Sequence, residues 1–290
     1  MFEYRFVRIS DEHFSRYYSV YCMENIFLHY DWAERLRNVK PESSGYILLK
    51  EETPMGGVTL NKNHISRPFL IEPFGNKYEF WTAVLKLTKG AEKELFLDFV
   101  PDTHRKVLEE IGAKRKHGQY KMLRPTAKMD AALDPHFYFD VLKENEIDNI
   151  ISVVYQAHLK GYTSTIMGMP SFENIARAVE RQITAFFQTQ TLGFGAVIKK
   201  RETHEMVAVC IAGIYPESTN DFATINQVSV LPEYRRKGLA NAMIRRVISN
   251  AHGKSPVIIL DVMDGNPSKK LYSELGFVAG CGYSDYVVES

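Results

Sequence analysis

The clearest pattern of apolar and polar positions lies between residues 222 and 251. Apolar and polar residues alternate through FATINQVSV (222–230), which predicts a strand with one buried face. One helical face then carries apolar residues at spacings of three and four: Leu239, Ala240, Met243, Ile244, Val247, Ile248 and Ala251. This spacing predicts a core-facing helix, and His252-Gly253 supplies its C-terminal stop.

A second strand and helix follow in the same order. The apolar run VIILDVM (257–263) has the composition of a buried strand. Asn266 is a good N-cap residue and Pro267 is favoured at a first helical position, so the next helix should begin there. Gly276 is placed to end it.

Earlier patterns extend the prediction through the second half of the chain. Strands are predicted at 137–143, 193–200 and 206–216, and helices at 146–159 and 171–183. The segment between the two helices, KGYTSTIMGMP (160–170), is rich in Gly, Thr and Met and is predicted as a loop.

The chain also contains an internal repeat. The segment beginning LFLDFVPDTHRKVLEEIG at residue 95 and the segment beginning IILDVMDGNPSKKLYSELG at residue 258 each predict a strand, turn, short helix and final strand. Each half also opens on a strand, at 3–10 and at 136–145. We therefore expect an α/β fold of two tandem domains, residues 1–128 and 134–290, each with a mixed sheet flanked by helices.

Composition narrows the class of protein. A chain of 290 residues suits two domains, and 45% hydrophobic with 24% charged residues is ordinary for globular proteins. A net charge of +1 predicts neither a nucleic-acid nor a membrane partner. Cys22, Cys210 and Cys281 form no pairing pattern, which indicates free thiols and a cytoplasmic protein. The histidines are scattered, so no metal site is expected.

The turn before the predicted helix at 239–251 contains the residues best suited to bind an anionic ligand. Arg235, Arg236 and Lys237 are consecutive cations, and Gly238 follows them. The first backbone N–H groups of a helix have no partner within it and favour an anion. Gly238 lets the backbone approach phosphate oxygens, because it has no Cβ. Strand, cationic turn and helix together predict a pocket for a phosphorylated ligand.

This segment resembles motif A of the GCN5-related N-acetyltransferase (GNAT) family, whose Arg/Gln-x-x-Gly-x-Gly/Ala signature is found here as Arg235, Gly238 and Ala240. Asn266 and Tyr272, six residues apart, resemble motif B. The resemblance covers roughly residues 137–290. It implies that acetyl-CoA is the co-substrate and that Tyr272 protonates the departing thiolate. The residues it implies for binding acetyl-CoA are Val228, Val230, Arg235, Arg236, Lys237, Gly238, Leu239, Ala240 and Asn266.

The general base stays open. Many relatives carry a Glu on the strand before motif A, whereas this chain has Asn226 and Gln227. The base can lie on another strand or in the N-terminal half, or be Asp285, Glu289 or the terminal carboxylate of Ser290. The 160–170 segment corresponds to the acceptor loop of the family, and its Tyr162, Met167 and Met169 line either a pocket or a helix-packing lid.

The two halves differ in chemistry. In the first half, Glu79 and Trp81 take the places of Gly238 and Ala240, and Leu108 takes that of Tyr272. The carboxylate of Glu79 and the indole of Trp81 would repel and block a pyrophosphate. The side chain of Leu108 has no proton to donate. We therefore expect one CoA per chain, bound by the second half, and a structural or substrate-covering first half.

The resulting prediction is a monomeric or homodimeric N-acetyltransferase that moves an acetyl group to a primary amine of a small molecule by direct attack in a ternary complex. The alternative is a non-catalytic acyl-CoA-binding sensor or regulatory protein. An aminoacyl-tRNA-dependent transferase is disfavoured by the intact 235–240 signature and the net charge near zero.

Overall fold

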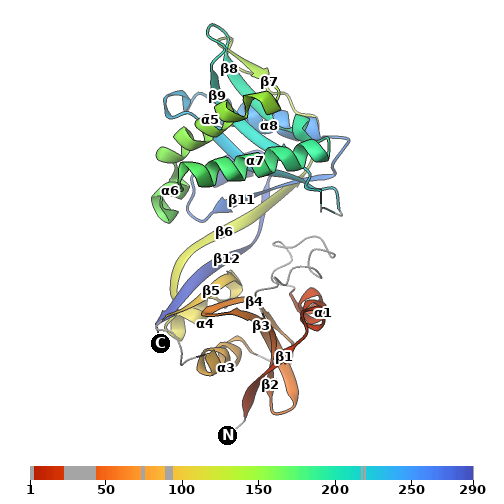
Figure 1. The fold of residues 1–290 in the computed structure, drawn as a ribbon, viewed down its shortest axis with the longest axis vertical. Coiled ribbons are helices and arrows are strands. Elements are labelled where there is room, and N and C mark those ends of the chain that lie inside the picture. Colours follow the sequence, from red (N-terminus) through yellow and green to blue (C-terminus); the bar gives the residue numbers. More distant parts are fainter. Residues whose placement is uncertain are drawn as a thin grey trace. The chain divides into compact units, whose positions relative to one another are not determined.

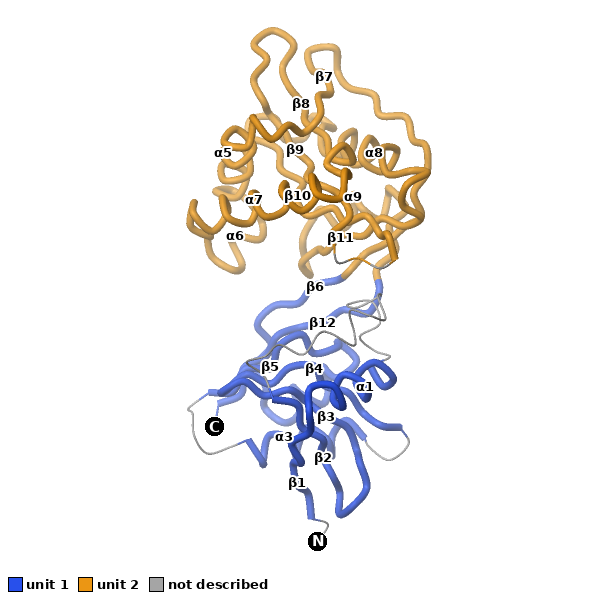
Figure 2. The backbone as a smooth tube through the Cα atoms, turned by 45° about the vertical axis from the view of Figure 1, so that its right-hand side comes forward, with its two compact units in different colours: residues 1–120, 280–290 blue, residues 121–279 orange. Residues whose placement is uncertain are grey.

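The computed structural model describes residues 3–22, 44–72, 76–88, 94–216, 218 and 220–289. The chain divides into two compact units, shown in different colours in Figure 2. Unit 1 comprises residues 1–120 and 280–290, and unit 2 comprises residues 121–279.

Unit 1 is a mixed sheet with flanking helices. Its strands are β1 (Tyr4–Ile9), β2 (Ser44–Lys50), β3 (Thr53–Asn61), β4 (His64–Leu70), β5 (Glu94–Pro101), the first part of β6 (Lys114–Pro125) and most of β12 (Val278–Glu289). Its described helices are α1 (Asp11–Tyr21), α3 (Lys77–Thr88) and α4 (Arg105–Glu110).

Unit 2 has the same kind of architecture. Its own strands are β7 (Phe137–Asp140), β8 (Ala196–Lys200), β9 (Met206–Gly213), β10 (Ala223–Val230) and β11 (Val257–Met263). Its helices are α5 (Ile147–Leu159), α6 (Tyr162–Met167), α7 (Phe172–Gln188), α8 (Leu239–Ala251) and α9 (Ser268–Glu274). Helix α6 lies in the segment predicted as a loop. Its fourth residue, Thr165, donates from both its backbone N–H and its hydroxyl to the carbonyl of Gly161.

The predicted repeat is present in the strand order. In unit 1, β1, β2, β3 and β4 pair antiparallel in turn, and β5 pairs parallel to β4. In unit 2, β7, β8, β9 and β10 pair antiparallel in turn, and β11 pairs parallel to β10. The α/β fold is confirmed, and the two units share the same pattern of strand pairing.

The last strand of each half does not stay within the domain predicted for it, 1–128 or 134–290. Strand β12 follows α9 in the chain, but from Tyr283 to Glu289 it pairs antiparallel with β5 of unit 1. Strand β6 follows α4, but residues 121–125 belong to unit 2, where Lys121 donates to Asp261 of β11. Each half therefore contributes its final strand to the sheet of the other, and the pairing, not the chain order, sets the boundary of each unit.

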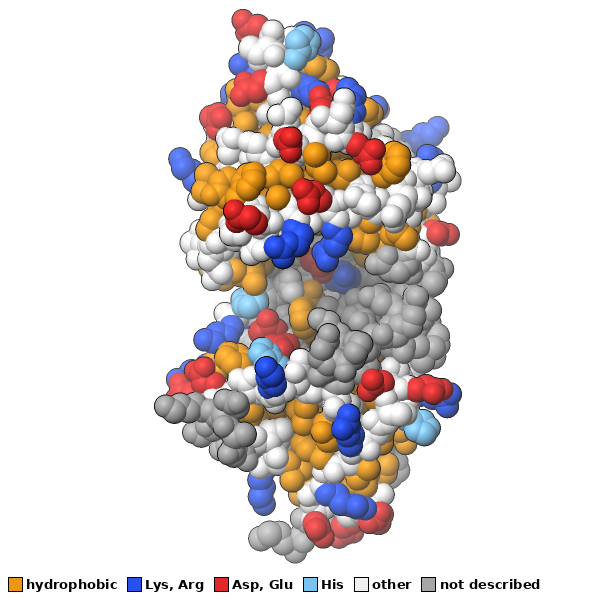
Figure 3. Space-filling view, in the orientation of Figure 1, with side chains coloured by type: hydrophobic (Ala, Val, Ile, Leu, Met, Phe, Trp, Pro, Cys, Tyr) orange, Lys and Arg blue, Asp and Glu red, His pale blue; other side chains and the backbone are white. Residues whose placement is uncertain are grey.

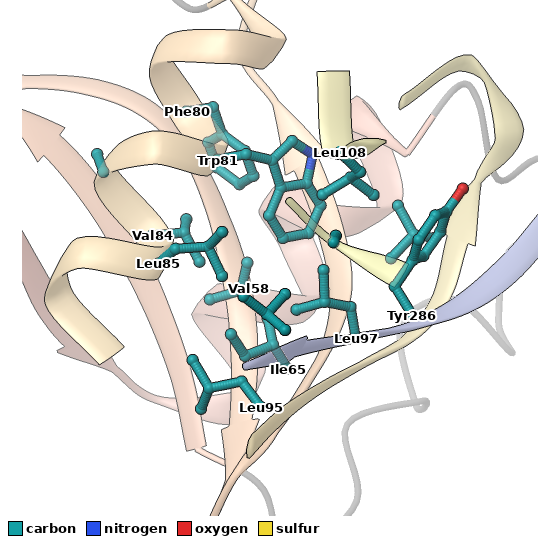
Figure 4. Close-up of a cluster of buried hydrophobic side chains, with 14 of the residues drawn as sticks. Val58, Ile65, Phe80, Trp81, Val84, Leu85, Leu95, Leu97, Leu108 and Tyr286 are labelled. Carbon is teal, nitrogen blue, oxygen red and sulfur yellow. The ribbon is translucent and has the colours of Figure 1, made fainter. Parts of the chain in front are cut away.

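The core of unit 1 fills the space beneath α3 and α4 (Figure 4). Trp81, Leu108 and Leu97 are fully buried, and Tyr286 of β12 packs in the same cluster. The indole Nε1 of Trp81 donates to Nδ1 of His104 over 2.8 Å. The contribution of β12 to this cluster explains why unit 1 requires the exchanged strand.

The sheet of unit 2 is covered on both faces (Figure 1). Val209 and Ile211 of β9 belong to one hydrophobic cluster with residues of α5 and α7. Neighbouring residues of a strand point to opposite faces, so Cys210 points to the other face, where α8 packs against β8, β9 and β10. Every residue of β9 is buried, as expected for a central strand.

Candidate active site

The sheet of unit 2 opens between β10 and β11. The two parallel strands pair only from Ala223 to Ile225, although β10 continues to Val230 and β11 to Met263. At the same point Asn226 forms a bulge against β9, because Ile225 pairs with Ala212 and Gln227 already pairs with Ile211. A bulge bends its strand and increases the local twist. The rest of β10 therefore turns away from β11 and offers its backbone to an extended ligand.

A buried polar atom marks the start of this opening. The Nδ2 atom of Asn226 is buried and has no hydrogen-bond partner among the described residues. Leaving such a donor unsatisfied is unfavourable by about 1–3 kcal/mol. A ligand carbonyl beside Asn226 would remove that cost, so the opening fits an amide- or thioester-bearing chain.

The loop between β10 and α8 has the geometry of an anion site. After a short 3-10 turn (Pro232–Tyr234), Arg236 and Gly238 both have positive φ, 63° and 77°, and Lys237 between them does not. Alternating handedness of this kind turns successive backbone N–H groups toward one side, which forms a concave anion nest. Gly238 is the N-cap of α8, so the free N–H groups of the first helical turn lie beside the nest.

Two features of position 238 favour glycine: the backbone conformation there and the open space in front of it. Its φ of 77° is a left-handed conformation that L side chains rarely adopt. A Cβ placed there would meet no protein atom within 4 Å. The space in front of Gly238 is thus open, as a bound phosphate would require.

The structure gives Arg235 a role that the sequence did not predict. Its Nε donates to the carbonyl of Val230 (3.2 Å), Nη1 to that of Lys160 (2.8 Å) and Nη2 to that of Ala157 (2.8 Å). The side chain therefore ties the C-terminal end of α5 to the end of β10 and does not reach out as a mobile cation. A direct contact of Arg235 with phosphate stays a prediction.

The other residues predicted to bind acetyl-CoA differ in how exposed their side chains are. Arg236 and Lys237 are exposed, and the Lys237 ammonium lies 5.2 Å from the centre of the Tyr234 ring. Leu239 is buried in the core, so it can contribute only its backbone, while Ala240 is half-buried. Val228 and Val230 are half-buried on the open part of β10. Their contacts with a ligand stay predictions.

The β11–α9 turn brings the residues of the second predicted motif to the site. The Oδ1 atom of Asn266 accepts from the backbone N–H of Ser268 over 2.9 Å, which is the predicted capping interaction at the start of α9. The helix ends at Gly276, whose φ is 84°, with the N–H of Phe277 bonded to the carbonyl of Tyr272.

Tyr272 lies in a dry environment. Burial, with a smaller electrostatic contribution from Cys210, raises the pKa of its hydroxyl to about 12. Cys210 is on β9 and pairs with Val228 of β10. Cys210 therefore links Tyr272 electrostatically to the neighbour of the strand that forms one side of the opening. The phenol keeps its proton at pH 7 and so has one to donate, although the raised pKa makes it a weaker acid than a free tyrosine.

His158, a residue that the sequence did not single out, lies on the α5 side of β10. Gln227 pairs with Ile211, whose side chain packs with α5, so Gln227 points toward that helix. Its side chain hydrogen-bonds to His158 in the last turn of α5. Nδ1 of His158 also lies 3.2 Å from the hydroxyl of Ser164 in α6. Periodicity could not reveal this meeting, because His158 and Gln227 come from separate elements.

Helix α6 is attached to the site at one end and exposed at the other. The Tyr162 hydroxyl donates to the carbonyl of Asp264 in the β11–α9 turn over 3.0 Å. Ile166, Met167 and Met169 are 50%, 57% and 38% exposed. Figure 3 shows hydrophobic side chains gathered over the region of α5, α6 and α7. Tyr162 thus holds the segment in place, while the methionines point into solvent.

The corresponding helix of unit 1 is closed to an anion. The carboxamide Oδ1 of Asn76 accepts from the N–H of Glu79 (2.8 Å), and the Asn76 Nδ2 donates to the Glu79 carboxylate (3.0 Å). Lys50 donates to the same carboxylate over 2.6 Å. The chain therefore satisfies its own helix N-terminus there. Trp81 and Leu108, which replace the small residue and the tyrosine, are fully buried core residues.

The remaining base candidates from the sequence have partners of their own in unit 1. Asp285 accepts from the N–H of Phe99 (2.7 Å) and pairs with His117 (3.0 Å), and Glu289 pairs with Lys114. Ser290 lies outside the described residues. Within the described part of the chain, no group of three or more His, Cys, Asp or Glu side chains could hold a metal ion. No helix of that part is long and apolar enough to cross a membrane.

Comparisons with known proteins agree with this geometry. The family model described as GNAT acetyltransferase matches residues 101–286. A GCN5-related N-acetyltransferase from Sphaerobacter thermophilus is similar in structure, with a TM-score of 0.69 and 13% identity over 99% of this chain and 95% of that one. A tandem GNAT protein from the clavulanic acid biosynthesis pathway has a TM-score of 0.57 and 11% identity, over 99% and 98% of the two chains.

A GNAT-family acetyltransferase from Colwellia psychrerythraea has a TM-score of 0.58 and 10% identity, over 99% of this chain and all of its own. At these identities the likeness concerns the fold alone. No curated protein is significantly similar in sequence.

Proposed function

The chain belongs to the GNAT acetyltransferase family, and we propose that unit 2 transfers an acetyl group from acetyl-CoA to a primary amine of a small molecule. The observation that carries this proposal is the opening between β10 and β11, which begins at Asn226 and leads to the anion nest before α8. An extended ligand with a phosphate group at one end and a polar carbonyl at the other suits that arrangement.

We assign the parts of acetyl-CoA to the residues that fit them. The backbone N–H groups from Arg236 to Ala240 hold the pyrophosphate, with Arg236 and Lys237 adding charge. The free backbone of Val228 and Val230 pairs with the pantetheine amides, and Asn266 orients the turn beside them. Acetyl-CoA supplies the activated acyl group as a thioester.

Groups of the protein then carry out the two proton transfers, from the attacking amine and to the departing sulfur. The acceptor amine must be neutral to attack, although a free primary amine has a pKa of about 10.4. Direct attack in a ternary complex therefore needs a group that takes the amine proton. Tyr272, which burial keeps protonated, donates a proton to the departing sulfur. We propose that a backbone N–H on β10 near Val228 stabilises the oxyanion.

Unit 1 is proposed to have a structural or substrate-covering role. Its helix α3 is capped by Asn76 and Glu79, and its core is filled by Trp81 and Leu108. We therefore expect one molecule of acetyl-CoA per chain.

Calorimetric titration of the full chain with acetyl-CoA tests the binding half of this proposal. The expected result is one site per chain, and two equivalent sites would contradict the assignment of unit 1. A thiol-release assay over polyamines, amino acids, aminoglycosides and peptides tests the catalytic half. Binding of acetyl-CoA with no turnover on any amine class would favour an acyl-CoA-binding sensor instead.

A further inference from the structure

We propose that the side-chain amide of Asn226 donates a hydrogen bond to the thioester carbonyl of acetyl-CoA and stabilises the oxyanion that forms there. The inference rests on the proposed function and adds a catalytic residue to it. Asn226 lies where the sheet opens, because Ile225 is the last residue of β10 that pairs with β11. It is also the extra residue of the bulge against β9.

The side chain of Asn226 carries a donor that the described part of the chain does not use. Its Nδ2 atom is buried, and no described residue accepts a hydrogen bond from it. The carboxamide of Asn250, in the last turn of α8, is different, because its Nδ2 donates to the carbonyls of Gly193 (3.2 Å) and Phe194 (3.3 Å). A buried donor without an acceptor lowers stability, so a ligand acceptor explains Asn226 better than packing does.

The position of Asn226 along β10 selects the carbonyl that it meets. The anion nest follows the far end of β10, after the 3-10 turn beyond Val230. From Val230 back to Asn226 the strand covers about 13 Å. The pantetheine arm spans about 15 Å from phosphate to sulfur, the reach of an extended peptide with the same number of bonds. An arm anchored in the nest and laid along β10 therefore passes Val228 with its amides and brings the thioester, its farthest carbonyl, to the bulge.

The bulge lies in a dry part of the sheet. The residues on either side of Asn226 pair with Ala212 and Ile211 of β9, which are both fully buried. A hydrogen bond to a developing charge is stronger where water is excluded. A carboxamide is uncharged, so it supplies the donor there without the cost of a buried ion.

This donor serves the attack of the amine on the thioester. The amine nitrogen forms a bond to the carbonyl carbon, and the π electrons of the C=O bond move to oxygen, which becomes an oxyanion. These electrons return as the C–S bond breaks and the thiolate leaves. The hydrogen bond from Asn226 strengthens as charge develops on oxygen, so it lowers the barrier more than it raises affinity. Asn226 transfers no proton, and the base that takes the amine proton is a separate group.

The test compares Asn226→Leu and Asn226→Ala with Asn250→Leu in the full chain. Leucine keeps the approximate size of the side chain and removes the donor, and alanine removes the donor without added bulk. Asn250→Leu is the matched control, because that carboxamide has its acceptors within the protein. Thiol release with the amine that wild type turns over fastest gives kcat. Calorimetry gives the affinities for CoA and acetyl-CoA, and urea unfolding gives stability.

Both Asn226 variants should lose about 10²–10³-fold in kcat and bind CoA, which has no thioester carbonyl, within about twofold of wild type. Asn226→Leu should unfold at the urea concentration of wild type or higher, since no hydrogen bond within the described chain is lost. Asn250→Leu should show the opposite pattern, with wild-type kcat and a lower urea midpoint. Wild-type kcat in both Asn226 variants would overturn the assignment. A loss of CoA affinity as large as the loss in kcat would overturn it too, because Asn226 would then hold a pantetheine amide or the bulge itself.

Infrared spectra of bound acetyl-CoA, labelled with carbon-13 at the thioester carbonyl, test the contact without an acceptor amine. The carbonyl band should lie at lower frequency in wild type than in Asn226→Ala, because a hydrogen bond weakens the C=O bond. Equal frequencies would overturn the assignment of Asn226 while the acetyltransferase function stands. A wild-type protein that turns over no amine overturns both the function and the catalytic role of Asn226.

Discussion

Replacing Gly238 with glutamate should abolish tight binding of acetyl-CoA, and the same replacement at Gly253 should not. The two glycines lie at opposite ends of helix α8 and have nearly the same backbone geometry, with φ of 77° and 81°. A Cβ meets nothing within 4 Å at either position. Both variants therefore carry a similar backbone penalty for a left-handed L-residue, roughly 1–2 kcal/mol of stability. The helix dipole adds a difference, because it favours a carboxylate at the N-terminus and disfavours one at the C-terminus.

The difference between the two variants lies in the anion nest. At Gly238 the new carboxylate stands where the proposed pyrophosphate accepts N–H bonds, and it repels a second anion. The loss of two charge-assisted hydrogen bonds at roughly 1.5–3 kcal/mol each amounts to roughly 3–6 kcal/mol. This corresponds to a rise in Kd of about 10²–10⁴-fold. At Gly253, beyond the C-terminus of the helix, no such ligand is proposed.

Calorimetry with acetyl-CoA measures the affinity of both variants, and urea unfolding measures the stability of each, so that a loss of affinity can be separated from a loss of folding. Gly238→Ala adds an intermediate case, because it introduces the backbone strain without the charge. Equal affinities for wild type and Gly238→Glu would show that phosphate binds elsewhere. Equal losses at Gly238 and Gly253 would show that the effect is one of stability and not of the nest.

Three further outcomes follow from the structure. Tyr272→Phe should bind acetyl-CoA normally and lose about 10²–10⁴-fold in thiol release, and an unchanged rate would leave Tyr272 a packing residue. Arg235→Lys should destabilise unit 2 by about 2 kcal/mol and speed amide hydrogen exchange near Ala157, whereas unchanged exchange with a large loss of acetyl-CoA affinity would make Arg235 a ligand. Asp140, bonded to Lys199 over 2.8 Å, has a pKa lowered to about 2, chiefly by that bond. Its carboxylate should therefore contribute about 2 kcal/mol of folding free energy above pH 4, lost as pH falls toward 2. The stability gap between wild type and Asp140→Asn in urea unfolding should close over that range, and a gap constant with pH would contradict this.

The duplicated fold has a physical consequence for the first unit. Its strands β4 and β5 also pair parallel over three positions only, from His64–Phe96 to Ser66–Asp98. The sheet geometry alone therefore does not make a binding site. The side chains decide, because Asn76 and Glu79 occupy the helix N-terminus and Trp81 fills the core. A binding site like the one proposed in unit 2 requires three features together: Gly238, the cations Arg236 and Lys237, and Tyr272.

Local patterns in the sequence predicted most elements of the second half, although not helix α6, and located the turn before α8. The apolar rows of α8, the cap at Asn266 and the stop at Gly276 depend on contacts within a few residues, and each is found where it was expected. The positive φ of Gly238 is a local property of the same kind. The internal repeat likewise predicted that the two units share a pattern of strand pairing, including one parallel pair in each.

Contacts between distant segments were decided only by the tertiary structure. The exchange of β6 and β12 depends on strand pairing, which no periodicity within a strand can specify, since any exposed edge of suitable length can accept a strand. The sequence shows the charge of Arg235 and not the carbonyls of Ala157 and Lys160 that bind it, so its structural role could not be predicted. His158 and Gln227 meet because the bulge at Asn226 sets which face of β10 each following side chain occupies. A single inserted residue in a strand reverses that alternation, so the composition of the site depends on a feature that only the folded sheet reveals.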